Sequence, residues 1–224
     1  MIIQSIANTF AKLFMGRQPI PDNFKNKQIS ALPLLAIDLE LTDLDTKTAK
    51  ITSIAWISAY LFDVDLSSAH YQVVRAKGDL KQSPVIHGLF AKDVANGQHI
   101  REQMLLLKEY VASHVWVFHN ATLDLRMINR VWQLLDFSPV TITYIDTMLL
   151  EVYVMEKTHG FVPSGEVTLG SSRLHYDLTQ APEHNALDDA LATMTLLFAQ
   201  LYEFDKTSQL ALASLKHTRS VGTF

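Results

Sequence analysis

Two acidic residues close an apolar stretch near the start of the chain. The segment LLAIDLE, residues 34–40, is apolar until Asp38 and Glu40. Side chains two residues apart on a strand share one face, roughly 6.5–7 Å from each other along it. Neighbouring carboxylates repel, and one of them is driven to protonate unless a cation lies between them. Hard divalent cations prefer oxygen ligands of this kind. The pair indicates a metal site or, taken alone, a strand whose acidic end is solvated.

A second pattern joins an apolar strand to an acidic helix start. VWVF runs into His119 and Asn120, and Asp124 falls in or near the first turn of the helix that follows. Asparagine and aspartate are favoured at helix starts, where acids also suit the helix dipole, so capping is one interpretation. The other is a carboxylate presented at the carboxyl end of a strand, where open α/β sheets build their sites.

A third pattern precedes the last long helix. In APEHNALDDALATMTLL, His184 comes five residues before Asp189. A histidine just before a helix, followed by an aspartate on it, can act as a general base beside a metal ligand. The alternative is a surface histidine and a charged helix face. Asp188 adjoins Asp189 and makes the register of the ligand ambiguous.

Together the three patterns carry more information than any one of them. In order they read D-x-E-x-T from residue 38, H-N-A-x-x-D from residue 119 and H-x-A-L-x-D-A from residue 184. This series resembles the DEDDh group of 3′→5′ exonucleases, the family of the proofreading subunit of the bacterial replicative polymerase. The resemblance covers residues 32–204, and VIHGL at 85–89 is similar to a segment of that family.

The resemblance implies a ribonuclease H-like fold with two metal ions, Mg²⁺ or Mn²⁺. Asp38 would bridge both ions, and Glu40 and Asp189 would complete one site. Asp124 would hold the second ion, directly or through water, and His184 would deprotonate the attacking water.

The resemblance also implies contacts with the terminal nucleotide. Thr42 and Asn120 stand beside the expected ligands, and Leu41 and Leu44 would pack on the terminal base. For the two leucines, an ordinary place in the core is the alternative. Of the adjacent aspartates, the H-x-A-L-x-D-A spacing of the third motif selects Asp189, and not Asp188, as the expected metal ligand.

The sequence departs from the family pattern at two positions. Asp43, with Asp45 beyond it, stands where many relatives have glycine after the threonine of the first motif. Leu123 replaces an aromatic residue before the aspartate of the second motif. Neither of these changes removes an expected ligand, but an added acid near the 3′-end pocket puts substrate affinity and preference in question.

The elements that must position these residues follow from the periodicity. Strands followed by alternating strands and helices predict an α/β fold with a mixed five-stranded sheet flanked by helices. We divide the chain into an N-terminal helix and linker (1–31), an exonuclease domain (32–204) and a C-terminal tail (205–224). The expected helices are 2–14, 98–113, 122–135, one starting at 146–147, and 186–204; the expected strands are 34–40, 51–62, 70–75, 115–118 and 141–145.

Composition limits the remaining classes of function. The chain has 224 residues, 48% of them hydrophobic, and its lack of cysteine excludes disulfides and thiolate chemistry. The net charge is −4, with +3 in residues 1–30, +2 in 205–224 and −9 between them. An acidic middle repels phosphate unless cations are bound there.

No apolar run is long enough for a bilayer and the start does not resemble a secretory signal, so we expect a soluble cytoplasmic protein without membrane contacts.

The sequence thus predicts a metal-dependent 3′→5′ exonuclease that acts on single-stranded 3′ ends of DNA or RNA. A DNA polymerase is a candidate partner. One alternative is a small-substrate RNA exonuclease of the oligoribonuclease or ribonuclease T kind. Another is a non-catalytic module of the same fold that docks on a polymerase. A degenerate module is expected to have lost at least one ligand position, and here all are filled.

Overall fold

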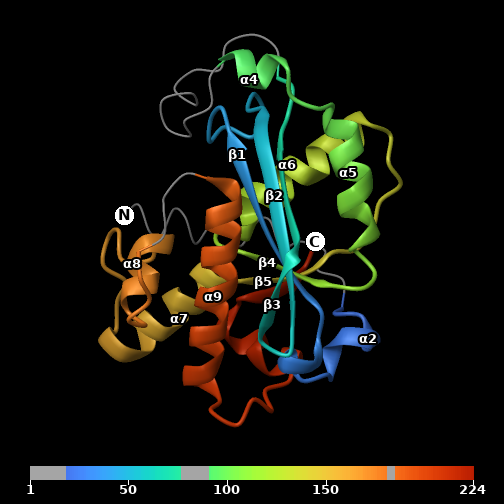
Figure 1. The fold of residues 1–224 in the computed structure, drawn as a ribbon. Helices are drawn as coiled ribbons and strands as arrows, with labels where there is room; N and C mark the ends of the chain where they lie inside the picture. The colour runs from blue at the N-terminus through green and yellow to red at the C-terminus, as the bar shows by residue number, and fades with distance from the viewer. Residues whose placement is uncertain (1–18, 77–90, 181–184) are drawn as a thin grey trace.

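A computed structural model of the chain describes residues 19–76, 91–180 and 185–224 (Figure 1). The predicted helix at 2–14 and the VIHGL segment lie outside the described residues. The elements in chain order are α2 Asp22–Lys25, η1 Ile29–Ala31, β1 Leu34–Leu41, β2 Ile51–Tyr60, β3 Asp63–Val73, α4 Ala91–Ala95, α5 Ile100–Glu109, β4 Val115–Phe118, α6 Ala121–Leu134, β5 Thr143–Asp146, α7 Thr147–His159, α8 Leu169–Leu174, α9 Ala186–Phe204, η2 Leu212–Thr218 and β6 Val221–Thr223.

The strands form one mixed sheet in the order β3-β2-β1-β4-β5-β6. β1 is antiparallel to β2 and parallel to β4, and β6 is antiparallel to β5. The predicted α/β class is confirmed, but the predicted number of five strands is wrong, because the described residues contain six. The added strand is β6, a segment of only three residues in which Gly222 packs against the Tyr144 ring. So short a segment carries no period-two signal in the sequence.

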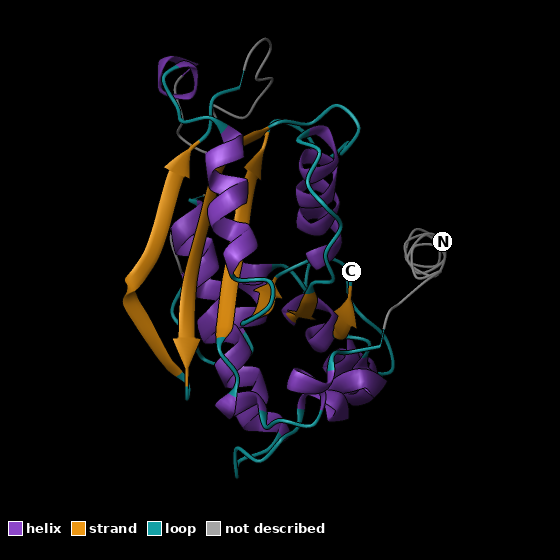
Figure 2. Ribbon diagram, turned by 90° about the vertical axis from the view of Figure 1, so that its right-hand side faces the viewer, coloured by secondary structure: helices purple, strands orange, loops and turns teal. Residues whose placement is uncertain are grey.

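Helices cover both faces of this sheet (Figures 1 and 2). One hydrophobic core joins one face to α5 and α6 and contains Trp116 and Phe118. The other core joins the opposite face to α7, α9, α2 and η2 and contains Val117 and Ile145. Because β1 contributes alternate residues to both cores, it is apolar almost throughout, as expected of a central strand.

Helix α9 spans the face that carries Asp38 and Glu40. Its apolar residues Ala190, Met194, Leu197 and Leu201 recur at helical spacing and lie in the second core. The helix begins after Asn185, whose side-chain oxygen accepts hydrogen bonds from the backbone of Leu187 and Asp188. The cap and the apolar stripe together fix the rotation of the first turn, and with it the direction of Asp189.

Segments on both sides of the predicted exonuclease domain pack into the second core. Residues 19–33, interpreted from the sequence as part of a linker, bury Ile20, Phe24, Ile29 and Leu32 there. Backbone hydrogen bonds tie this segment to the C-terminal region: Ile29 N–H donates to Leu210 and Leu212 N–H donates to Lys27.

None of the helices described has the combination of length and apolar character that crossing a bilayer requires.

Candidate active site

Asp38 and Glu40 lie on a half of β1 that has a neighbouring strand on one side only. β1 pairs with β2 along its length but with β4 only over Leu34–Ala36. Beyond that point β4 ends and the chain turns into α6, which leaves the carboxyl half of β1 beside the start of that helix. The two acids lie opposite small side chains, Ala55 and Ser53, on β2.

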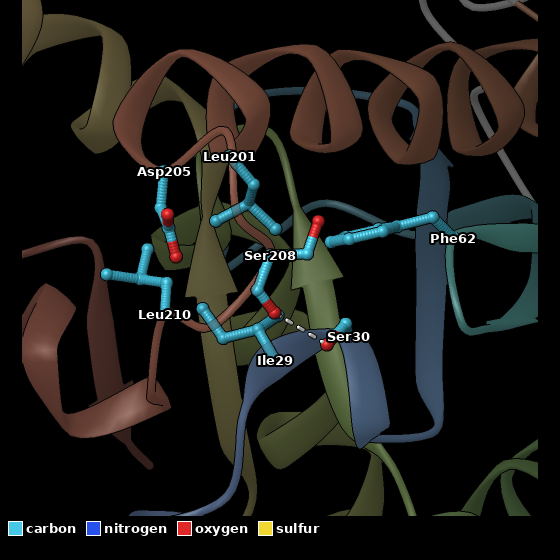
Figure 3. A pocket seen from close by; sticks show the side chains of 7 residues that line it. All are labelled: Ile29, Ser30, Phe62, Leu201, Asp205, Ser208 and Leu210. Atoms are coloured by element: carbon cyan, nitrogen blue, oxygen red, sulfur yellow. Dashed lines mark hydrogen bonds between the residues drawn. The ribbon is translucent and has the colours of Figure 1, made fainter.

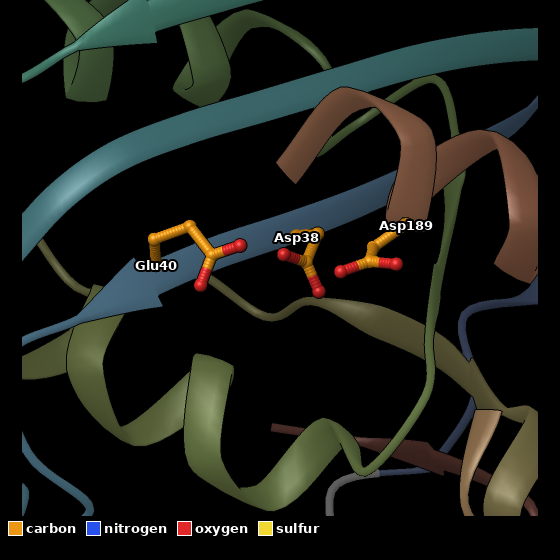
Figure 4. A group of neighbouring side chains, drawn as sticks. All are labelled: Asp38, Glu40 and Asp189. Carbon is orange, nitrogen blue, oxygen red and sulfur yellow. The ribbon is translucent and has the colours of Figure 1, made fainter. Parts of the chain in front are cut away.

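Asp189 joins these two residues from the first turn of α9. Asp38, Glu40 and Asp189 each offer a carboxylate oxygen, and these three oxygens lie within 4.8 Å of one another. Figure 4 shows the Asp38 carboxylate between those of the other two residues. Of the adjacent aspartates 188 and 189, the structure brings the second into the group.

Asp124 contributes a fourth buried carboxylate from α6. It lies outside the group of three. It is nevertheless close enough for its charge to raise the pKa of Asp38. The charge of Glu40 in turn raises the pKa of Asp124. Segments far apart in the sequence therefore bring four acids to one end of β1.

Electrostatics at this end of the sheet disfavour four free carboxylates. Burial raises the pKa of Asp38 well above its usual range, and the charges of Asp124, Glu40 and Asp189 raise it further. Burial also raises the pKa of Asp124, with added contributions from Asp146 and Glu40. A donor set made only of carboxylate oxygens fits a hard divalent cation such as Mg²⁺ or Mn²⁺, whose charge would remove this repulsion.

The turn that carries Asn120 is held by a buried carboxylate at the end of β5. Asp146 Oδ1 accepts hydrogen bonds from the backbone N–H groups of Asn120 at 3.1 Å, Met148 at 3.0 Å and Leu149 at 3.3 Å, and Oδ2 from Ala121 at 3.0 Å. One side chain thus caps both α6 and α7. It also holds Asn120 in the left-handed region, at φ 73°. The Asn120 side chain makes no cap hydrogen bond to α6, so it stays available for another contact.

His119 serves as a structural support beside this turn. Its Nδ1 lies 2.9 Å from Thr147 Oγ1 and its Nε2 lies 2.9 Å from the Val167 carbonyl. Burial lowers the pKa of His119 to about 4, so the ring is neutral near pH 7. Since a carbonyl only accepts, Nε2 carries the proton and donates to Val167, while Nδ1 faces the Thr147 hydroxyl, which itself donates to the Phe118 carbonyl at 3.1 Å. The ring therefore joins the end of β4 to the loop before α8.

The predicted substrate-contacting residues at the end of β1 and in the loop after it differ in burial. Leu41 is buried in the first core, whereas Leu44 is 79% exposed. Thr42 is buried, and its hydroxyl oxygen accepts a hydrogen bond from Lys50 N–H at 3.0 Å. Leu41 therefore packs in the core, as its alternative interpretation has it, whereas the side chain of Leu44 is accessible to a ligand.

A residue that the sequence did not single out fixes the same loop. Arg130 Nη1 donates to the carbonyls of Thr46 at 2.9 Å and Ala49 at 2.8 Å. The added acids also serve the loop, because Asp43 accepts from the backbone of Asp45. Arg130 lies on the predicted helix after the second motif, but no spacing rule relates it to residues so far away in sequence.

His184 lies outside the described residues, which resume at Asn185 at the start of α9.

A small pocket lies far from the carboxylates, where the second core meets the C-terminal segment (Figure 3). Leu201 and Phe62 line it, and Ser30 Oγ donates to the Ser208 carbonyl at its edge. Leu201 is twelve residues beyond Asp189 on α9, which is about 18 Å at 1.5 Å per residue. The pocket is therefore separate from the candidate active site.

The geometry above matches a known class of proteins. A model of the family described as exonuclease matches residues 35–197, most of the chain, and the chain belongs to this family. The membership of the DEDDh exonuclease group predicted from the three motifs is confirmed. No curated protein matches the sequence.

Solved structures show the same fold at low sequence identity. Cell-death related nuclease 4 is 15% identical, with a TM-score of 0.66 over 80% of this chain and 66% of that one. Exonuclease X, in complex with 5′ overhanging duplex DNA, is 22% identical, with a TM-score of 0.57 over 80% of this chain and 97% of its own. E. coli exonuclease I, in complex with a dA16 oligonucleotide, is 11% identical, with a TM-score of 0.65 over 79% of this chain. The chain spans 42% of the length of that exonuclease I.

Proposed function

We propose that this chain is a metal-dependent 3′→5′ exonuclease that releases nucleoside 5′-monophosphates from single-stranded ends of DNA or RNA. The observation that carries the proposal is the convergence of Asp38, Glu40 and Asp189, with their oxygens within 4.8 Å. Membership of the exonuclease family agrees with this chemistry. Two neighbours of the same fold are described in complex with DNA, which favours DNA as the first substrate to test.

In this proposal each acid has a separate task. Asp38 would contribute to the sites of two divalent ions, Glu40 and Asp189 would complete one of these sites, and Asp124 would hold the other ion directly or through water. When bound, such ions lower the pKa of water and neutralise the charge that develops in an in-line displacement. Four carboxylates and two divalent ions together are neutral, so a phosphodiester can approach.

The remaining tasks fall to residues near the turn and the loop. His184 accepts a proton from the attacking water, whose oxygen bonds to phosphorus while the bond to the 3′ oxygen of the preceding nucleotide breaks. Thr42, Asn120 and Leu44 position the terminal nucleotide, and Leu41 supports the loop from the core. The proposal includes the cytoplasmic location expected from the sequence composition, and a polymerase as partner, which the family resemblance implies.

One incubation series tests the activity. Labelled DNA and RNA oligonucleotides, single-stranded and duplex, are incubated with the full chain in Mg²⁺, in Mn²⁺ and in EDTA. We expect 5′-mononucleotides from single strands with either ion and none in EDTA, because the empty site repels phosphate. Preference for very short RNA would select the oligoribonuclease-like alternative. Binding without product in every condition would select the docking module and reject the nuclease.

The role of His184 requires its own variant. Replacing a positioned general base typically costs ~10²–10⁴ in rate, so His184→Ala is expected to lose that much kcat. A pH–rate profile that also loses its acidic limb identifies the histidine as the titrating base. Unchanged kcat would assign the base to another group.

A further inference from the structure

The edge strand β3 carries an aromatic residue on the face that holds the acids. Tyr71 on β3 lies directly opposite Ala55 on β2, which lies opposite Asp38 on β1. Directly opposed residues of antiparallel strands point to the same face. With strands about 4.8 Å apart, the Tyr71 and Asp38 backbones are about 10 Å apart.

The Tyr71 hydroxyl is close enough to the acids for the charge of Glu40 to raise its pKa. On β2, Ser53 is the residue opposite Glu40. Ser53 is diagonal to Tyr71 across the strand pair, a distance that aromatic side chains can reach. Burial, followed by the charges of Glu40 and Asp93, raises the pKa of Tyr71, so the phenol is protonated near pH 7.

Helix α4 lies at one end of the sheet (Figure 1), and the charge of its residue Asp93 acts on Tyr71. Gln98 N–H donates to the Val73 carbonyl, and Arg75 N–H donates to Gln98. A Cβ on Gly97 would come within 2.7 Å of the Val73 carbonyl oxygen, so only glycine allows this approach. Tyr71 thus lies within reach of the charges of Glu40 and of Asp93 on α4, and it is still 37% exposed.

We propose that Tyr71 is a substrate-contacting residue whose ring stacks on a nucleobase next to the scissile phosphate. The inference rests on the proposed function, since that function places the phosphate at Asp38 and Glu40. An aromatic ring suits this place because every base offers a π face, while another acidic group would add repulsion. The sequence-based predictions did not include Tyr71, because it lies on a strand outside the three motifs.

Binding of a labelled single-stranded DNA oligonucleotide tests this without requiring turnover. Fluorescence anisotropy in Ca²⁺ compares the intact strand with strands that lack the base of the terminal or the penultimate nucleotide. Base–aromatic stacking is worth about 5- to 100-fold in affinity, so Tyr71→Ala is expected to weaken binding of the intact strand by that factor. Tyr71→Phe keeps the ring and is expected to stay within about threefold of wild type.

The double-mutant comparison decides the assignment. If Tyr71 stacks on a base, removing that base and removing the ring are not additive, and one abasic strand loses most of its sensitivity to Tyr71→Ala. Equal weakening for every strand, or no weakening at all, would overturn the proposal. Tyr60 is the matched control: it is 51% exposed on β2, five residues from Ala55 and about 17 Å along the strand, and Tyr60→Ala should bind as wild type does.

Hydrolysis in Mg²⁺, measured in parallel, keeps the two proposals apart. Base-dependent binding with no hydrolysis would retain the assignment of Tyr71 and reject the nuclease. Hydrolysis, together with a Tyr71→Ala effect that is the same with and without each base, would retain the nuclease and reject the stacking role of Tyr71.

Discussion

Asp38 and Asp146 are acids on strands of one sheet, and the protein surrounds them in opposite ways. Burial raises the pKa of both. Around Asp146, four backbone N–H groups donate to the carboxylate and hold its pKa to about 6. Around Asp38, the charged groups that act on the carboxyl are three further acids, and each of them raises its pKa.

This difference separates a carboxylate that caps helices from one for which we propose a catalytic role. The protein supplies hydrogen-bond donors to Asp146 and thereby joins the starts of α6 and α7. At Asp38 it gathers like charges instead, an arrangement that costs stability unless cations bind. Buried acids of this second kind are typical of functional sites.

The largest expected effect is the loss of activity in Asp38→Asn. A metal ion supplies several kcal/mol of transition-state stabilisation, so losing the bridging ligand should lower kcat by about 10³ or more. The same change removes a charge from the cluster, so thermal unfolding in EDTA should occur at or above the wild-type temperature. Retained turnover would contradict the role of Asp38 in catalysis.

Asp146→Ala should have the converse result. It leaves four backbone donors at two helix starts without their acceptor, which should lower the free energy of unfolding by about 2–4 kcal/mol. Urea denaturation in EDTA measures this, with Asp205→Ala as the control: its carboxylate accepts from the backbone of Thr207 and Gln209 in a surface turn, so its removal should cost much less stability. A stable Asp146→Ala protein would remove the distinction between the two acids.

Added metal should stabilise the wild type against unfolding, but it should stabilise the Asp38→Asn variant much less. At an ion concentration 100 times the dissociation constant, linkage gives about 2.7 kcal/mol of added stability. The unfolding temperature of the wild type should therefore rise with Mn²⁺, and that of Asp38→Asn should rise much less. An equal rise in both would place the ion elsewhere.

The smallest effect is a pH dependence in EDTA. A carboxyl whose pKa is raised in the folded state binds more protons folded than unfolded, so its unfavourable contribution is present above the folded pKa and disappears as the pH falls toward 3.8. The stability advantage of Asp38→Asn over wild type should then shrink on acidification, by at most about 1.4 kcal/mol per pH unit. An advantage that grows at low pH would have the wrong sign. Saturating Mn²⁺ at neutral pH should abolish the stability advantage of Asp38→Asn over wild type.

The sequence predicted the elements near the motifs well because their signals are local. The apolar run of β4, the aspartate cap of α7 at Asp146 and the stripe of α9 over 186–204 all match the structure. β3 is longer than its predicted segment 70–75, because it begins at Asp63 with polar residues on an exposed edge. The contacts of Arg130 and Tyr71 join elements distant in sequence, and one chain alone carries no signal for such pairings.

We propose that the four acids bind a pair of divalent ions. Anomalous diffraction from crystals of the full chain grown with Mn²⁺ tests this most directly. We predict two peaks among Asp38, Glu40, Asp124 and Asp189, about 3.5–4 Å apart. Carboxylates turned away from one another, with no anomalous density among them, would contradict it.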